Sequence, residues 1–63
     1  MLTRREKESV VLAIKGHSNK LIGRQLGITE GTVKIHLSNI YRKLGVQNRT
    51  ALTMLAYREQ FKG

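Results

Sequence analysis

Cysteine is absent from this chain of 63 residues, and proline is absent as well. Without cysteine the chain can form neither a disulfide framework nor a thiolate metal site, and a metal would have to rest on His17 and His36 alone, which is a poor ligand set. We therefore expect no cofactor. The absence of proline, together with the absence of β-type alternation, favours an all-α domain.

Long apolar runs are also missing. None approaches the roughly 18 residues of a membrane span, and the first residues, MLTRREKE, lack the apolar stretch of a signal peptide. We expect no membrane partner and a cytoplasmic protein. No nucleophile occurs together with a base and an orienting acid, and the four acidic residues show no paired arrangement. No Gly-rich phosphate loop occurs either, so we expect no enzyme.

Acidic residues are scarce relative to basic ones. Twelve Lys and Arg against four Asp and Glu leave a net charge of +8. Such an excess favours a polyanionic partner, with nucleic acid ahead of an anionic membrane surface. A basic surface that merely keeps a small domain soluble is the alternative.

Glycines divide the chain, which we expect to be a single domain over residues 1–63, into four helical pieces. Gly16, Gly27 and Gly45 each follow a helix-forming run, where a left-handed residue commonly ends a helix. The first helix is predicted to begin at Thr3, because Thr3 and Glu6 have the spacing of a capping box. Its inner face should be formed by Val10, Ala13 and Ile14.

Three further helix starts are indicated. Ser18 can cap a short helix over residues 19–26, with Ile22 and Leu26 turned inward. Thr29 can cap a third helix that ends at Gly45, and a fourth should begin near Asn48 and continue to about residue 61.

The segment over residues 29–46 separates its apolar and polar positions onto opposite sides of one helix. One stripe is formed by Val33, Leu37, Ile40 and Leu44. The opposite side carries Gly31, Ile35, Ser38 and Arg42, with Lys34 on its flank. Such a helix can pack on a core with one side and enter a DNA major groove with the other.

A helix-turn-helix needs a small residue where its two helices approach, a turn residue that tolerates positive φ, and apolar anchors around both. The chain supplies this set in order with Ile22, Gly23, Leu26, Gly27, Ile28 and Val33. Only His36 is irregular, because many such motifs have an apolar anchor there.

The fourth helix carries apolar residues around most of its circumference: Ala51, Leu52, Met54, Leu55, Ala56 and Tyr57. A helix of this kind must be covered on more than one side, which suggests a partner. The alternative is a terminal helix with a few tolerated exposed apolar side chains.

Four pieces of the chain resemble the LuxR-type, or GerE-like, helix-turn-helix family of bacterial response regulators and quorum-sensing activators. They are LTRREKE (2–8), GHSNKLIGRQLGIT (16–29), GTVKIHLSNIYRKLGV (31–46) and NRT (48–50). The resemblance implies a four-helix domain whose third helix reads the major groove and whose fourth helix contributes to a homodimer. We expect this dimer to be weak without DNA. The chain departs from the family pattern at Ser9, Leu21, Gly23, Ala51 and Leu52, and the last two alter the helix that would carry the dimer surface.

The resemblance places base-reading residues at Lys34, Ile35 and Ser38. Lys34 could instead meet a phosphate, and Ile35 could be an exposed side chain without a role. Phosphate contacts are expected, by side-chain type and family position, from Asn19, Lys20, Thr32, His36, Tyr41, Arg42 and Arg49. For His36, a half-buried ring with a hydrogen bond is an equal alternative. The dimer surface is expected at Ala51, Met54, Leu55 and Arg58.

The sequence thus predicts a domain that binds double-stranded DNA at specific sites and regulates transcription. We expect its activity to be controlled by a separate receiver or ligand-binding domain, with RNA polymerase as a candidate partner. The alternative is a protein-interaction module that has the helix-turn-helix fold and no specific DNA site.

Overall fold

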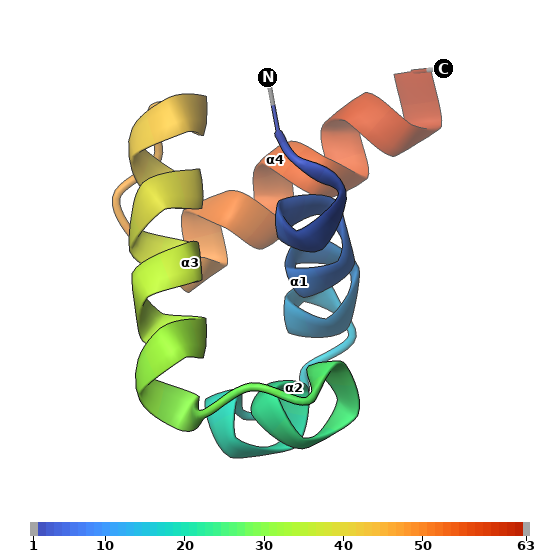
Figure 1. The fold of residues 1–63 in the computed structure, drawn as a ribbon. Coiled ribbons are helices and arrows are strands. Elements are labelled where there is room, and N and C mark those ends of the chain that lie inside the picture. The colour runs from blue at the N-terminus through green and yellow to red at the C-terminus, as the bar shows by residue number, and fades with distance from the viewer. Residues whose placement is uncertain (1, 63) are drawn as a thin grey trace.

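The computed structural model describes residues 2–62, and the side chains of residues 2–59, as four helices joined by short connections. They are α1 (Arg4–Ile14), α2 (Asn19–Leu26), α3 (Glu30–Leu44) and α4 (Arg49–Lys62) (Figure 1). Residues 2–62 contain no strand. The predicted all-α class and the four predicted helices are confirmed.

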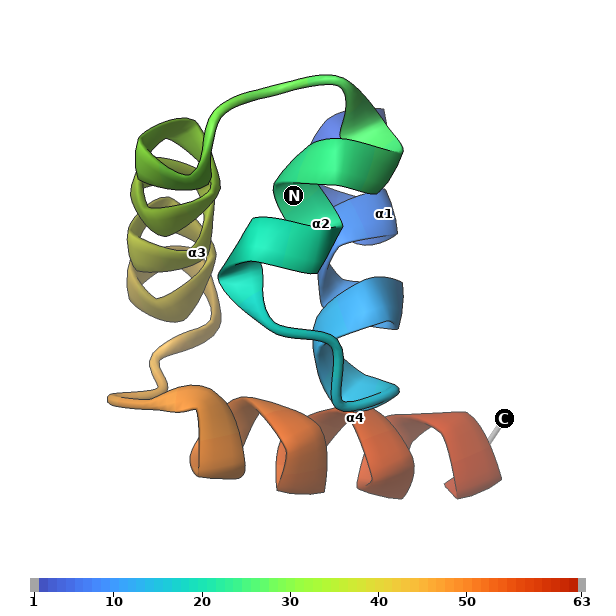
Figure 2. The ribbon, with the colours of Figure 1, turned by 90° about the horizontal axis from the view of Figure 1, so that it is seen from below.

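The helices surround one small core. α3 and α1 stand side by side, α2 lies across one end of this pair, and α4 crosses behind it (Figure 1). Seen from below, α2 lies in front of α1 and beside α3, and α4 runs along one edge of the domain (Figure 2). α3 packs on both α2 and α1, whereas α4 packs mainly on α1.

The predicted helix starts are confirmed by their caps. The Glu6 backbone N–H donates to the Thr3 hydroxyl at 3.1 Å, and the Thr3 N–H donates to the Glu6 carboxylate at 2.8 Å, which completes the capping box. Ser18 and Thr29 each accept a backbone N–H three residues further on, at 3.1 Å. Each hydroxyl satisfies a donor that the first helical turn cannot pair internally.

Glycine ends α2 and α3 as predicted. Gly27 and Gly45 are left-handed, with φ of 72° and 70°, and their backbone N–H groups donate back to carbonyls of the last turn. At the end of α1 the C-cap is Lys15 in the right-handed region, and Gly16 with φ of 89° comes one residue later. The left-handed glycine after α1 therefore lies one position beyond the C-cap, whereas Gly27 and Gly45 are themselves the C-caps of their helices.

The core draws on all four helices. Its buried apolar side chains are Ala13, Ile22, Val33, Leu37, Ile40 and Leu52. Val10, Leu26 and Leu44, which were expected to face inward, are half-buried and pack against this cluster. Ile14 is also half-buried. Among the described side chains of α4, only Leu52 is buried.

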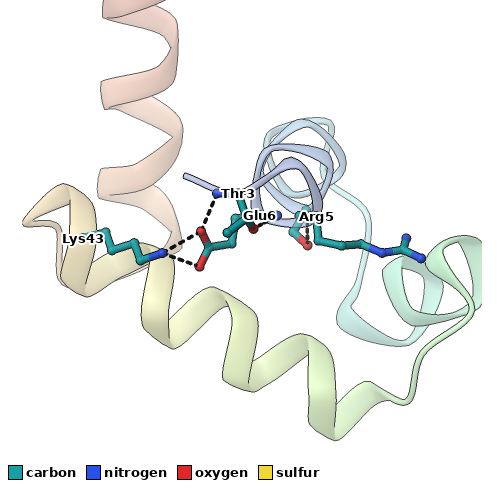
Figure 3. A network of polar contacts seen from close by, with 5 residues as sticks. Thr3, Arg5, Glu6 and Lys43 are labelled. Carbon is teal, nitrogen blue, oxygen red and sulfur yellow. Dashed lines mark hydrogen bonds and ion pairs between the residues drawn. The ribbon is translucent and has the colours of Figure 1, made fainter. Parts of the chain in front are cut away.

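Among the described side chains, two buried polar residues complete the interior. Ser9 is fully buried, and its hydroxyl donates to the Arg5 carbonyl at 3.0 Å, so its polar atom is satisfied within α1. The Glu6 carboxylate accepts from the Lys43 ammonium at 2.9 and 3.1 Å (Figure 3). The backbone N–H of Thr3, and then the Lys43 side chain, lower the pKa of Glu6. This ion pair joins the first turn of α1 to the last turn of α3.

Candidate nucleic-acid interface

The close approach of α2 to the start of α3 depends on Gly23. A Cβ built on this buried glycine would lie 2.6 Å from the carbonyl oxygen of Ile28 and 3.3 Å from the carbonyl carbon of Thr29. The Ile28 N–H in turn donates to the Gly23 carbonyl at 2.9 Å. Gly23 is therefore the small contact residue of the helix-turn-helix and not an incidental helix-weakening glycine.

The outer side of α3 is open to solvent along its length. Lys34, Ile35 and Ser38 are exposed, with Ile35 at 61%, while Val33 and Leu37 on the opposite side are buried. The predicted separation of faces is confirmed. Contact of these three side chains with DNA bases stays a prediction. The fold is compatible with it, because a helix with one free side is able to enter a groove about 12 Å wide.

The candidate phosphate contacts come from the start of α2 and from α3. Lys20 and Arg42 are exposed, whereas Asn19, Thr32 and Tyr41 are half-buried. Asn19 is the first residue of α2. The helix start therefore offers backbone N–H groups and a positive dipole end beside the Asn19 and Lys20 side chains. Thr32 also shares a hydrogen bond of 2.9 Å with the hydroxyl of Thr29.

His36 is half-buried on α3. Its Nδ1 is buried and has no hydrogen-bond partner among the residues that the structure describes. The alternative expectation of a ring held by a hydrogen bond is therefore not met at Nδ1. A phosphate contact for His36 stays a prediction.

Arg49 has contacts that the sequence did not indicate. Its Nη2 donates to the His17 carbonyl oxygen at 2.6 Å, and its Nη1 donates to Asn19 Oδ1 at 3.4 Å. Its Nε is buried without a hydrogen-bond partner among the described residues. These partners lie 30 and 32 residues away in the chain. No local pattern points to so distant a pair, and the guanidinium is already engaged inside the domain.

The predicted dimer surface on α4 is exposed in part. Met54 is 68% exposed and Arg58 is exposed, whereas Ala51 and Leu55 are half-buried. Leu52 points into the core. Among these apolar side chains of α4, Leu52 is thus buried, Ala51 and Leu55 are half-buried, and Met54 is exposed.

The described residues offer few other kinds of site. No three His, Asp or Glu side chains among them come together as ligands for a metal ion. No helix in the described part is long and apolar enough to cross a membrane.

Comparison with known proteins identifies the family. Residues 1–56 match the family described as bacterial regulatory proteins, luxR family. The chain is 54% identical over 52 residues to the monoamine regulon transcriptional regulator of Klebsiella aerogenes, which covers 82% of this chain and 23% of that protein. It is 52% identical over 50 residues to the transcriptional regulatory protein DegU of Brevibacillus brevis, which covers 79% of this chain and 21% of that protein.

A third relative is the response regulator protein VraR of Staphylococcus aureus strain Mu3. It is 49% identical over 57 residues, which covers 90% of this chain and 27% of that protein. The chain therefore spans about a quarter of the length of these relatives. With the helix-turn-helix geometry and a match over residues 1–56, the chain belongs to the luxR family of bacterial regulatory proteins.

Proposed function

We propose that this domain binds double-stranded DNA at specific sites and thereby regulates transcription, with α3 in the major groove. The observation that carries the proposal is the exposed outer side of α3, which bears Lys34, Ile35 and Ser38 on a helix whose other side is buried. The net charge of +8 favours the same partner. The relatives' names describe transcriptional regulators and a response regulator.

Sequence would be read by three side chains of different chemistry. The Lys34 ammonium is suited to donate to guanine O6 or N7, and Ile35 is suited to pack on a thymine methyl group. Ser38 can donate or accept and therefore discriminates weakly. Register on the duplex would come from contacts that carry no sequence information, made by Asn19, Lys20, Thr32, His36, Tyr41 and Arg42.

We further propose that two copies pair on DNA through α4, weakly in its absence, and that RNA polymerase is a partner of the bound regulator. The exposed patch that includes Met54 and Arg58 is the surface for pairing. A two-fold pair of helix-turn-helix domains requires half-sites about one helical turn apart. The preferred DNA should then be an inverted repeat with centres about 10 base pairs apart.

The test begins with selection of bound sites from a random duplex pool. Lys34→Ala should then weaken binding to the selected site about 10- to 100-fold and relax the preference at one base position. Lys7→Ala is the matched control, because it removes the same charge from α1, where Lys7 lines a groove with Gln25 and Leu26 of α2. This variant should bind nearly as the parent does.

Each other outcome has a definite meaning. Equal losses on selected and random DNA would make Lys34 a phosphate contact. Failure of the parent to enrich any site would refute specific DNA binding and favour the protein-interaction module.

A further inference from the structure

We propose that Arg49 is a positioning residue, which holds the Asn19 side-chain amide so that its Nδ2 group is free to donate to a DNA phosphate. The inference rests on the proposed DNA binding, and it differs from the phosphate contact that the family resemblance implies for Arg49. Arg49 would act on DNA through Asn19 and not by touching the duplex.

The first step is the placement of the guanidinium. Nη2 donates to the His17 carbonyl at 2.6 Å, and Nη1 donates to Asn19 Oδ1 at 3.4 Å, so one planar group joins the two residues that flank the Ser18 cap. Nε is buried. These two contacts and the burial of Nε hold the guanidinium against the start of α2.

The second step is the anchoring of Arg49 itself. It is the first residue of α4, and its carbonyl accepts from the Thr53 hydroxyl at 3.0 Å. Asn48 just before it accepts the Ala51 N–H at 2.8 Å, in the manner of a helix cap. The backbone that carries the guanidinium is thus held by the first turn of α4, and the start of α4 is tied to the start of α2.

The third step is the chemistry of the amide. An arginine only donates, so it can hold an asparagine only through Oδ1. With Oδ1 facing Arg49, the Nδ2 donor lies at the opposite end of the amide. Phosphate oxygens only accept, and Asn19 is half-buried at the start of α2, where backbone N–H groups also favour an anion. Arg49 therefore selects the amide orientation that suits a phosphate.

The test is a double-mutant cycle of Arg49→Gln and Asn19→Ala, read as affinity for a duplex with a single half-site at several salt concentrations. Each single change should weaken binding about three- to tenfold, the size of one hydrogen bond. The double variant should bind no more weakly than the weaker single variant, because both remove the same contact. The salt slope should stay unchanged, since neither change removes a charge that neutralises a phosphate.

Arg5→Gln is the control for charge. It removes the same unit charge from an exposed residue of α1 and should leave half-site affinity nearly unchanged. Circular dichroism of every variant in the binding buffer should show a folded domain. Additive losses with a salt slope lower by about one unit would overturn the proposal in favour of a direct phosphate contact. Unchanged affinity in folded Arg49→Gln would also overturn it.

A second measurement needs no DNA and keeps the proposal separate from the proposed function. In ¹H–¹⁵N spectra of the free domain, Arg49→Lys should shift the two Nδ2 proton signals of Asn19, because a lysine lacks the planar pair of donors. The side-chain signals of Asn39 on α3 should not move. Unchanged Nδ2 proton signals of Asn19 would overturn the proposal even if the parent binds DNA. This measurement on Arg49→Lys also tests the proposal if Arg49→Gln fails to fold.

Discussion

α3 and α4 are similar in length, but they are held by different means. α3 presents a continuous inner side, with Val33 and Ile40 fully buried, and both of its ends are capped. α4 buries Leu52 but leaves Met54 68% exposed. A one-sided apolar pattern determines how a helix must lie, because only one orientation removes that side from water. A helix with apolar residues all round has no such preferred side.

The position of α4 is therefore set by individual contacts in its first turns. The Arg49 side chain donates to a carbonyl in the connection between α1 and α2, and Leu52 packs in the core. The Thr53 hydroxyl donates to the Arg49 carbonyl. The comparison implies that the placement of α3 depends on its whole buried apolar side, whereas the placement of α4 depends on a few individual residues.

The largest effect is expected from the inner side of α3. Leu37→Ala removes a buried side chain and should lower the free energy of unfolding by about 2–4 kcal/mol. Urea unfolding followed by circular dichroism measures this loss. Met54→Ala on α4 is the matched control and should change stability by no more than about 0.5 kcal/mol. Equal effects of the two changes would erase the distinction between the helices.

A smaller loss is expected where α2 meets α3. In Gly23→Ala the added methyl group meets the Ile28 carbonyl at 2.6 Å, so the turn must widen at a cost of about 1–3 kcal/mol. Gly31→Ala is the control, because its nearest neighbour is the Thr29 hydroxyl at 3.9 Å. It should raise stability by up to about 1 kcal/mol through helix propensity. Thermal melts of both variants decide the point, and a stabilised Gly23→Ala would contradict it.

For α4, the expected effect concerns assembly more than stability. Met54→Glu places a charge in the exposed patch and should reduce cooperative binding to an inverted repeat several-fold, with half-site affinity and stability nearly intact. Val11→Glu puts the same charge on an exposed apolar position of α1 and should leave cooperativity alone. Gel shifts over a range of protein concentrations measure this. Noncooperative binding by the parent would refute pairing through α4.

The smallest effect is expected at acid pH. Because the pKa of Glu6 is lowered in the folded domain, its contribution to stability is present above the ordinary glutamate value of about 4.3. It is lost as pH falls below that value and through the lowered one. Glu6→Gln keeps an acceptor for the capping box but removes the charge that binds Lys43. Its stability should therefore change less than the parent's between neutral and acid pH.

Urea unfolding at about pH 7, 5 and 3 measures this difference across the titration of Glu6. Glu8→Gln is the control, because it removes a carboxylate from the exposed side of the same helix. A Glu6→Gln variant with the parent's full acid sensitivity would show that the pair with Lys43 does not contribute.

Local signals made most of this fold predictable. A cap and its helix, or a glycine and its turn, lie within a few residues, so Thr3, Ser18, Thr29 and Gly45 could be assigned from spacing alone. Contacts between distant residues could not. Lys43 meets Glu6 across 37 residues, and nothing near either residue indicates the pair.

The candidate site likewise contains one part that local pattern predicted and one part that depends on contacts between distant residues. The exposure of Lys34, Ile35 and Ser38 follows from helical periodicity, and the structure confirms it. Arg49 was assigned by its charge and its place in the family pattern, neither of which indicates which way the side chain turns. Its contact with His17 depends on how α4 lies against α1 and α2, which only the complete fold determines.

The separation of the two sides of α3 also bears on how such a domain can diversify. Substitutions at positions 34, 35 and 38 fall on exposed side chains, where changes usually alter stability by no more than about 0.5 kcal/mol. Mutations at sites without shared partners tend to act independently. Under the proposed function, in which these side chains read the DNA sequence, a lineage is free to acquire a new operator preference in single steps without first accumulating compensating changes in its interior.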